Sequence, residues 1–269
     1  MLLLFFLVEL VGVVLGPLAV AFWWRRRSGA TWQAWFFGVA TFTVSQLILR
    51  LPLLTLLTMA LRDVDVSPSS PAVWVFNAVV LSFSAGLFEE WGRWFFLKYL
   101  AKHVRDFREG VMFGLGHGGI EAIVLVGLNV MGTLVLLLMG DAILAQLSAL
   151  APQDADAVRQ QIEAVRTLPA WTPLLGLWER VLAMTLHVAL TLLVVHAVRQ
   201  QRRALVWLAV GWHGLFNLLA LVVLRLTESA LAVEVALTIA TLASVWAIGR
   251  LREALTTEQM TIDSAESAC

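Results

Sequence analysis

Cysteine is almost absent from this chain of 269 residues, and its single copy, Cys269, is the last residue. A lone cysteine excludes a disulfide within these residues and any metal site built from a cysteine cluster. An excess of positive charge is also missing, since 19 basic side chains balance 19 acidic ones and give a net charge of zero. We therefore expect no nucleic acid among the partners.

Charge of either sign is scarce as well. Charged residues make up 14% of the chain and hydrophobic residues 60%, whereas a soluble domain is about 25% charged and about half apolar. Several apolar runs approach or exceed the roughly 20 residues that span a bilayer. The sequence thus predicts an all-α fold, a polytopic membrane helix bundle surrounded by the lipid bilayer.

The apolar runs divide into about seven transmembrane helices. The expected spans are 3–24, 32–61, 73–99, 110–139, 171–197, 204–225 and 229–249. We expect residues 1–254 to form a single integral membrane domain and the polar residues 255–269 to be a disordered tail. The one long connection, 141–170, has the composition of an amphipathic helix lying over the membrane surface.

Basic residues alternate between the two sets of connections. One set carries 12 of them: Arg25, Arg26, Arg27, Lys98, Lys102, Arg105, Arg108, Arg199, Arg202, Arg203, Arg250 and Arg252. The other set carries four: Arg62, Arg159, Arg166 and Arg225. The positive-inside rule places the richer set in the cytoplasm, so the N-terminus is expected outside and the C-terminus inside. The strong preference for arginine over lysine is typical of high-GC bacterial genomes, which indicates a bacterial inner membrane.

Two adjacent glutamates, Glu89 and Glu90, interrupt the third apolar run. A carboxylate in a membrane segment costs roughly 2.5–3.5 kcal/mol on insertion scales, so it requires a partner. At about 1.5 Å of helix rise per residue, the pair lies roughly 10–12 Å from the cytoplasmic surface. By the same measure His117, His187 and His213 lie at roughly 10–15 Å on three other spans. Four helices are thus expected to bring two carboxylates and three histidines to one depth.

Spacing along the helices supplies partners for these groups. Three pairs are four residues apart and share a helical face: Glu89 with Arg93, His117 with Glu121, and His213 with Asn217. Glu179 and Arg180 precede His187 on its span and can form an ion pair that locks helices together. Glycines that would let the helices approach closely flank the site: Gly92, Gly114, Gly116, Gly118, Gly119, Gly211 and Gly214.

The arrangement resembles a known group of membrane enzymes. Four motifs occur in order: Glu-Glu-Trp-Gly-Arg-Trp at 89–94, Gly-His-Gly-Gly-Ile-Glu at 116–121, Glu179-Arg180 followed by His187, and His-Gly-Leu-Phe-Asn at 213–217. They resemble the CAAX prenyl protease type II (ABI) superfamily of intramembrane proteases and, more closely, its YhfC-type glutamic members. The resemblance covers residues 87–217 and implies a catalytic core at about 73–225. In one departure, two residues rather than three separate Glu90 from Arg93.

The resemblance implies an intramembrane endopeptidase that acts on membrane-embedded or lipid-anchored peptides and proteins. In the implied mechanism Glu89 is the general base for a water held with His117, and Glu90 orients partners or shares protons. His213 and Asn217 stabilise the oxyanion, and Arg93 positions the carboxylate. His187, Glu121, Glu179 and Arg180 are auxiliary. From the estimated depth of the site, we expect substrate to enter from the cytoplasm or the inner leaflet.

Other interpretations use the same residues. Glu89, His117, His187 and His213 could supply the ligands of a catalytic zinc, although no HExxH helix is present and metal-free glutamic catalysis is favoured. A proton-coupled transporter is the main alternative from another class, because intramembrane Glu/His clusters also relay protons. A non-catalytic membrane scaffold is the third.

Overall fold

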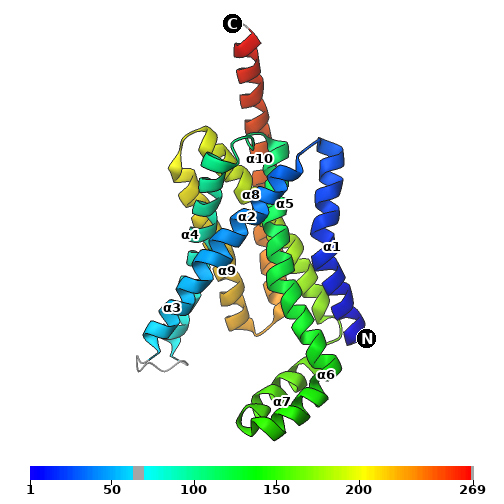
Figure 1. The fold of residues 1–269 in the computed structure, drawn as a ribbon. Coiled ribbons are helices and arrows are strands. Elements are labelled where there is room, and N and C mark those ends of the chain that lie inside the picture. Colours follow the sequence, from blue (N-terminus) through cyan, green and yellow to red (C-terminus); the bar gives the residue numbers. More distant parts are fainter. Residues whose placement is uncertain (63–69, 268–269) are drawn as a thin grey trace.

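The computed structural model describes residues 1–62 and 70–267, with the backbone alone for Pro152 and residues 258–267, and helices joined by short connections make up these ranges (Figure 1). Within them, seven helices are long and apolar enough to cross a membrane. They cover Leu2–Ser28, Trp32–Leu61, Pro71–Leu100, Phe107–Leu150, Thr172–Arg199, Arg203–Thr227 and Ala230–Thr257. The predicted fold class and the predicted number of spans are confirmed.

Three of the spans contain a π-helical segment, and the others are regular α-helices. The second span comprises α2 (Trp32–Phe42), η1 (Thr43–Arg50) and α3 (Leu51–Leu61); the third comprises α4 (Pro71–Phe95) and η2 (Phe96–Leu100); the fourth comprises α5 (Phe107–Glu121), η3 (Ala122–Gly127) and α6 (Leu128–Leu150). The remaining helices are α1 (Leu2–Ser28), α7 (Pro152–Arg166), α8 (Thr172–Arg199), α9 (Arg203–Thr227) and α10 (Ala230–Ser267). Such π-helical turns often accompany functional sites.

Helix caps fix the residues at which two of the spans that carry site residues begin. The Thr31 side chain accepts a hydrogen bond from the Ala34 amide at the start of α2, and the Asp106 side chain accepts one from the Glu109 amide at the start of α5. The two caps are also joined, because the Thr31 hydroxyl donates to the Glu109 carboxylate over 2.8 Å. Both helices therefore begin at one level, and α5 enters the bundle in a fixed position.

Helix α8 lies at the centre of the bundle. Its most apolar 18 residues are 72% buried, compared with 17–33% in the other six spans. Helix α5 packs tightly against it: a Cβ on Gly114 would lie 2.8 Å from the Val188 Cα, and one on Gly118 would lie 3.3 Å from the His187 side chain. As predicted, these glycines let the helices approach closely. Gly211 does not have this role, since a Cβ there would meet no heavy atom within 4 Å.

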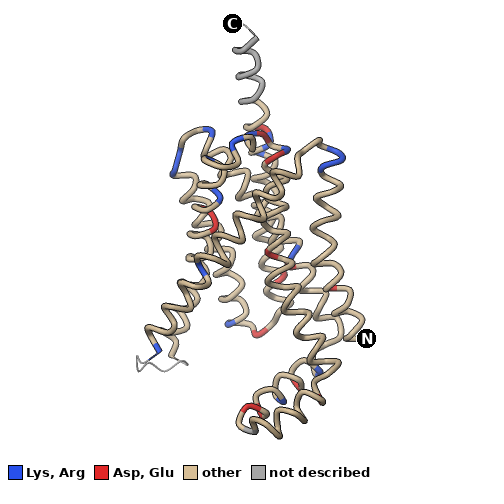
Figure 2. Tube along the Cα trace, in the orientation of Figure 1, with Lys and Arg blue, Asp and Glu red and all other residues tan. Residues whose placement is uncertain are grey.

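The connections with the most basic residues gather at one end of the bundle, the upper end in Figure 2. Arg108 donates a hydrogen bond to the Ser28 carbonyl over 3.3 Å, and Arg199 donates one to the Arg105 carbonyl over 3.0 Å. We call this the basic end and the other the opposite end. The chain starts at the opposite end, and α10 leaves the bundle at the basic end (Figure 1).

Two segments differ from the prediction or refine it. Within 141–170, α6 continues to Leu150 and is followed by α7, which folds back along it with an Arg166–Asp141 ion pair of 2.9 Å. Helix α10 runs to Ser267 and so includes most of the segment that we expected to be disordered. The stretch 250–267 contains no glycine or proline to end a helix. Residues 268–269 lie outside the described residues.

Candidate active site

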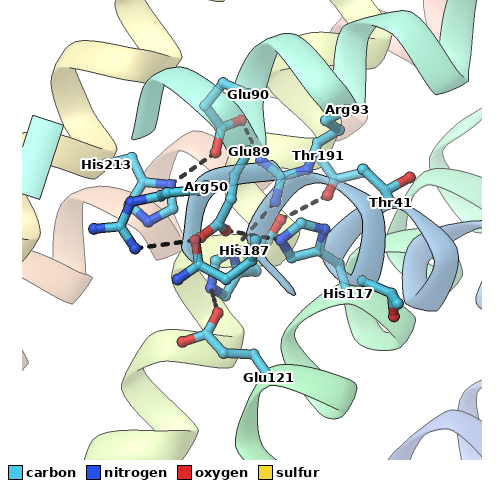
Figure 3. Close-up of polar contacts among 12 residues, drawn as sticks. Thr41, Arg50, Glu89, Glu90, Arg93, His117, Glu121, His187, Thr191 and His213 are labelled. Carbon is cyan, nitrogen blue, oxygen red and sulfur yellow. Dashed lines mark hydrogen bonds and ion pairs between the residues drawn. The ribbon is translucent and has the colours of Figure 1, made fainter. Parts of the chain in front are cut away.

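Glu89 and His117 form a buried pair between α4 and α5 (Figure 3). His117 Nε2 lies 2.9 Å from Glu89 Oε2, and the exposed fractions of the two residues are 0% and 2%. Since a carboxylate accepts the hydrogen bond, Nε2 carries a proton. His117 Nδ1 is buried and has no hydrogen-bond partner among the described residues.

Glu90 points away from Glu89 because consecutive residues on a helix are about 100° apart. Glu90 Oε1 accepts a hydrogen bond of 2.9 Å from His213 Nδ1 on α9, and Oε2 accepts one from Arg93 Nη1 on its own helix. Both oxygens of Glu90 are therefore occupied, whereas Glu89 Oε1 has no hydrogen bond to any described residue. Arg93, which comes one residue early in the motif, contacts Glu90 rather than Glu89.

Arg93 also connects this pair to α8. Its Nη2 lies 3.2 Å from His187 Nδ1. A guanidinium only donates, so Nδ1 accepts and His187 carries its proton on Nε2, which lies 2.5 Å from Glu121 Oε2. Arg180 Nη1 donates to the other oxygen of Glu121 over 3.2 Å, and its Nη2 pairs with Glu179. One network thus joins α4, α5, α8 and α9.

The structure brings most of the predicted site residues into this network. We call its central members the polar centre: Glu89, Glu90, Arg93, His117, Glu121, His187 and His213. The His187 ring lies 4.9 Å from that of His117 and 5.3 Å from that of His213, centre to centre. Glu179 and Arg180 lie at the edge of the polar centre. Asn217 lines the adjoining cavity and forms no hydrogen bond with the described residues.

A cavity of about 190 Å³, which we call the central cavity, adjoins the polar centre. Polar residues from five helical segments line it: Gln46, Arg50, Glu89, Glu121, Glu179, Arg180, His187, His213 and Asn217. It extends from Glu89 and His213 towards the opposite end of the bundle, and not towards the basic end as we expected. Buried apolar side chains, among them Leu97, Phe113 and Val194, fill the space on the basic side.

Arg50 belongs to the site but was not among the predicted site residues. It lies in η1 with an exposed fraction of 6% and lines the central cavity. Its guanidinium donates to Ser84 Oγ at 2.9 Å, to Gln46 Oε1 at 3.0 Å and to the Leu81 carbonyl at 2.6 Å. The sequence feature that could have identified it is its position as an isolated arginine within the second apolar run.

Four residues of the polar centre could hold a metal ion. The ligand atoms of Glu89, His117, Glu121 and His187 all lie within 4.8 Å of one another. Two carboxylates and two imidazoles form a nitrogen and oxygen donor set that suits zinc and similar divalent ions, so the residues present fit such an ion. This group contains Glu121 where the predicted zinc set had His213.

Comparison with known proteins agrees with the resemblance seen in the motifs. The model of the YhfC intramembrane metalloproteases matches residues 10–245, which include every residue of the site. The chain belongs to the YhfC intramembrane metalloprotease family. The uncharacterized membrane protein YhfC of Bacillus subtilis (strain 168) is 28% identical over 235 residues, 86% of this chain and 90% of that relative. No solved structure matches the chain. The wider relationship to the CAAX proteases stays a prediction.

Proposed function

We propose that this YhfC-family protein is an endopeptidase that hydrolyses membrane-embedded or lipid-anchored peptides and proteins at the central cavity. The observation that carries the proposal is the buried Glu89–His117 pair beside a polar cavity within an apolar bundle. We also propose that the basic end faces the cytoplasm of a bacterial cell, in line with the positive-inside rule. The central cavity then extends towards the outer leaflet.

The metalloprotease description of the family and the donor set favour a metal-dependent enzyme over the metal-free chemistry that the sequence favoured. His117, Glu121 and His187 would hold a divalent ion, with zinc the first candidate, and Glu89 would remain beside it. Such an ion, when bound, polarises a carbonyl group and makes a bound water more acidic.

Glu89 is the candidate general base. It lines the central cavity, and its Oε1 is left without a hydrogen bond to the described residues. That oxygen can take a proton from a water in the cavity. Glu90 is unsuited to this step because Arg93 and His213 occupy both of its oxygens. Its role is to hold His213 in one orientation.

His213 and Asn217 are candidates for stabilising the tetrahedral intermediate. They lie one turn apart on α9, and both line the central cavity. His213 Nδ1 donates to the Glu90 carboxylate, so a doubly protonated His213 ring would also carry a proton on Nε2. His213 Nε2 and the Asn217 amide can then donate hydrogen bonds to an oxyanion.

Cleavage of a fluorogenic apolar peptide by the purified protein in liposomes tests the proposal. We expect the wild type to cleave, a chelator to stop cleavage and added zinc to restore it. Bound zinc measured on the purified protein is expected to fall in Glu121→Gln but not in Glu253→Gln, whose carboxylate is 72% exposed. Cleavage that survives complete removal of metal would overturn the metal-dependent mechanism, and no cleavage of any apolar peptide would overturn the proposed activity.

A further inference from the structure

A second cavity of about 480 Å³ lies next to the central cavity, towards the opposite end. It is lined by residues of α1, η3, α6, α7, α8 and α10. Leu125, Glu179 and Arg180 line both cavities, so the two meet at the Glu179–Arg180 pair. A chain that occupies the central cavity can therefore extend into this second space.

Three helices each place a carboxylate at this second space, which we call the acidic cavity. Glu9 comes from α1, Glu179 from α8 and Glu234 from α10. Glu9 and Glu234 are buried, with exposed fractions of 4% and 6%. Glu9 lies so close to Gly176 of α8 that a Cβ at that glycine would overlap its carboxylate. The helices thus pack closely around these carboxylates.

Acidic residues outnumber basic ones in the lining of the acidic cavity. Among the described residues that line it, Arg180 is the single basic one, and its two Nη atoms already pair with Glu121 and Glu179. Glu234 Oε2 is buried without a hydrogen-bond partner among the described residues. A buried carboxylate without a partner is costly. The cavity is therefore complementary to a cation.

The spacing of the acids favours an organic cation over a metal ion. In the described part of the chain, the group whose ligand atoms lie within 4.8 Å of one another is the one at the polar centre, and Glu9, Glu179 and Glu234 do not form another. An ammonium or guanidinium group has three to five N–H donors and can reach separated acceptors. Apolar neighbours such as Phe6 and Val130 can cover the methylene stem of a basic side chain.

We propose that the acidic cavity is a subsite for a lysine or arginine side chain of the peptide substrate. The inference rests on the proposed peptidase function, since it takes the occupant of the central cavity to be a polypeptide. Glu9 and Glu179 lie roughly 10 Å, and Glu234 roughly 6 Å, along their helices from the opposite end. The basic side chain would therefore bind between the polar centre and that end.

Binding of labelled peptides to Glu89→Gln tests the subsite without cleavage. The probes are apolar helical peptides with acetylated N-termini, each with one lysine at a stepped position, and matched peptides with norleucine there. We expect one lysine position to bind at least about tenfold more tightly than norleucine, the effect of a charge-assisted hydrogen bond. A probe with a free N-terminus and no lysine shows whether a terminal ammonium binds instead.

The preference for lysine should disappear when Glu9→Gln and Glu234→Gln are added to the Glu89→Gln protein. It should persist with Glu163→Gln, whose carboxylate is 63% exposed on α7 and does not line the cavity. Equal affinities for lysine and norleucine at every position would overturn the proposal with no further variant needed. So would a preference that survives loss of both acids, or one shown by the terminal ammonium alone.

The two proposals can fail separately in these experiments. If Glu89→Gln binds lysine probes preferentially but the wild type cleaves none, the subsite stands and the peptidase function is wrong. If the wild type cleaves apolar peptides but lysine improves binding at no position, the subsite is wrong and the peptidase function stands.

Discussion

The polar centre and the acidic cavity both bury carboxylates, but the two regions differ in the partners that these carboxylates have. In the polar centre Glu90 has Arg93 and His213 as partners, and Glu121 has His187 and Arg180. In the acidic cavity Glu234 Oε2 has no hydrogen-bond partner among the described residues. Paired charges hold a fixed geometry, as catalysis requires. Unpaired charges beside an open volume suit a site whose partner arrives with the ligand.

The largest effect that distinguishes the two regions should be on cleavage. His213→Ala removes the ring that we propose donates to the oxyanion, and we expect kcat to fall by about 10²–10³-fold, the typical loss for one such donor. Steady-state cleavage of a membrane peptide measures it. His103→Ala, an exposed histidine near Phe37, serves as the control and should leave kcat unchanged. A change in KM alone for His213→Ala would contradict the assigned role.

The next effect concerns stability. Arg93→Met leaves Glu90 buried without its cation, which should lower the free energy of unfolding by about 3–5 kcal/mol. Denaturant titration in detergent micelles measures this change. Arg159→Met provides a match, because its side chain is 54% exposed in a surface pair with Asp156 and should cost at most about 1 kcal/mol. Equal effects of the two substitutions would show that Arg93 does not support the polar centre.

A smaller loss of stability is expected from a substitution at the contact between α5 and α8. Gly114→Ala places a Cβ against the backbone of Val188, and we expect a loss of about 1–3 kcal/mol in unfolding free energy from overpacking. Gly211→Ala faces open space and should be neutral or stabilise its helix by up to about 1 kcal/mol. Thermal unfolding of both variants gives the comparison. A stable Gly114→Ala protein would mean that α8 can move away from α5.

The smallest effect has the opposite sign to that of Arg93→Met. Glu234→Gln removes a buried carboxylate oxygen that has no partner, so stability should stay the same or rise by about 1 kcal/mol. The same denaturant titration applies. A loss above about 2 kcal/mol would indicate that Glu234 supports the fold, and the contrast between the two regions would then be lost.

Much of this arrangement could be predicted from the sequence, because bilayer thickness fixes helix length and basic residues mark alternate connections. Apolar runs gave the spans, and helix rise placed Glu89, His117 and His187 at one depth. Depth does not fix the rotation of each helix, however. The sequence therefore could not show that Glu121 replaces His213 in the group of possible metal ligands, or that Arg93 meets Glu90.

The direction in which the central cavity extends could not be predicted from the sequence either. It depends on side chains such as Leu97 and Phe113, which fill the basic side and come from different helices. Glu9 was visible as the one acid in the first apolar run. Its grouping with Glu179 and Glu234 arises only from the way α1, α8 and α10 pack together. Periodicity within one helix cannot show such a grouping.

The most direct test of the account compares cleavage of one membrane peptide by the wild type, Glu89→Gln and Glu253→Gln in the same liposomes. Loss of a general base costs about 10²–10⁴-fold in rate, so Glu89→Gln should cleave at least about 100 times more slowly. Glu253→Gln should match the wild type, because its carboxylate is exposed and pairs only with Arg250 among the described residues. Wild-type cleavage by a folded Glu89→Gln protein would contradict the assignment of the polar centre as the active site.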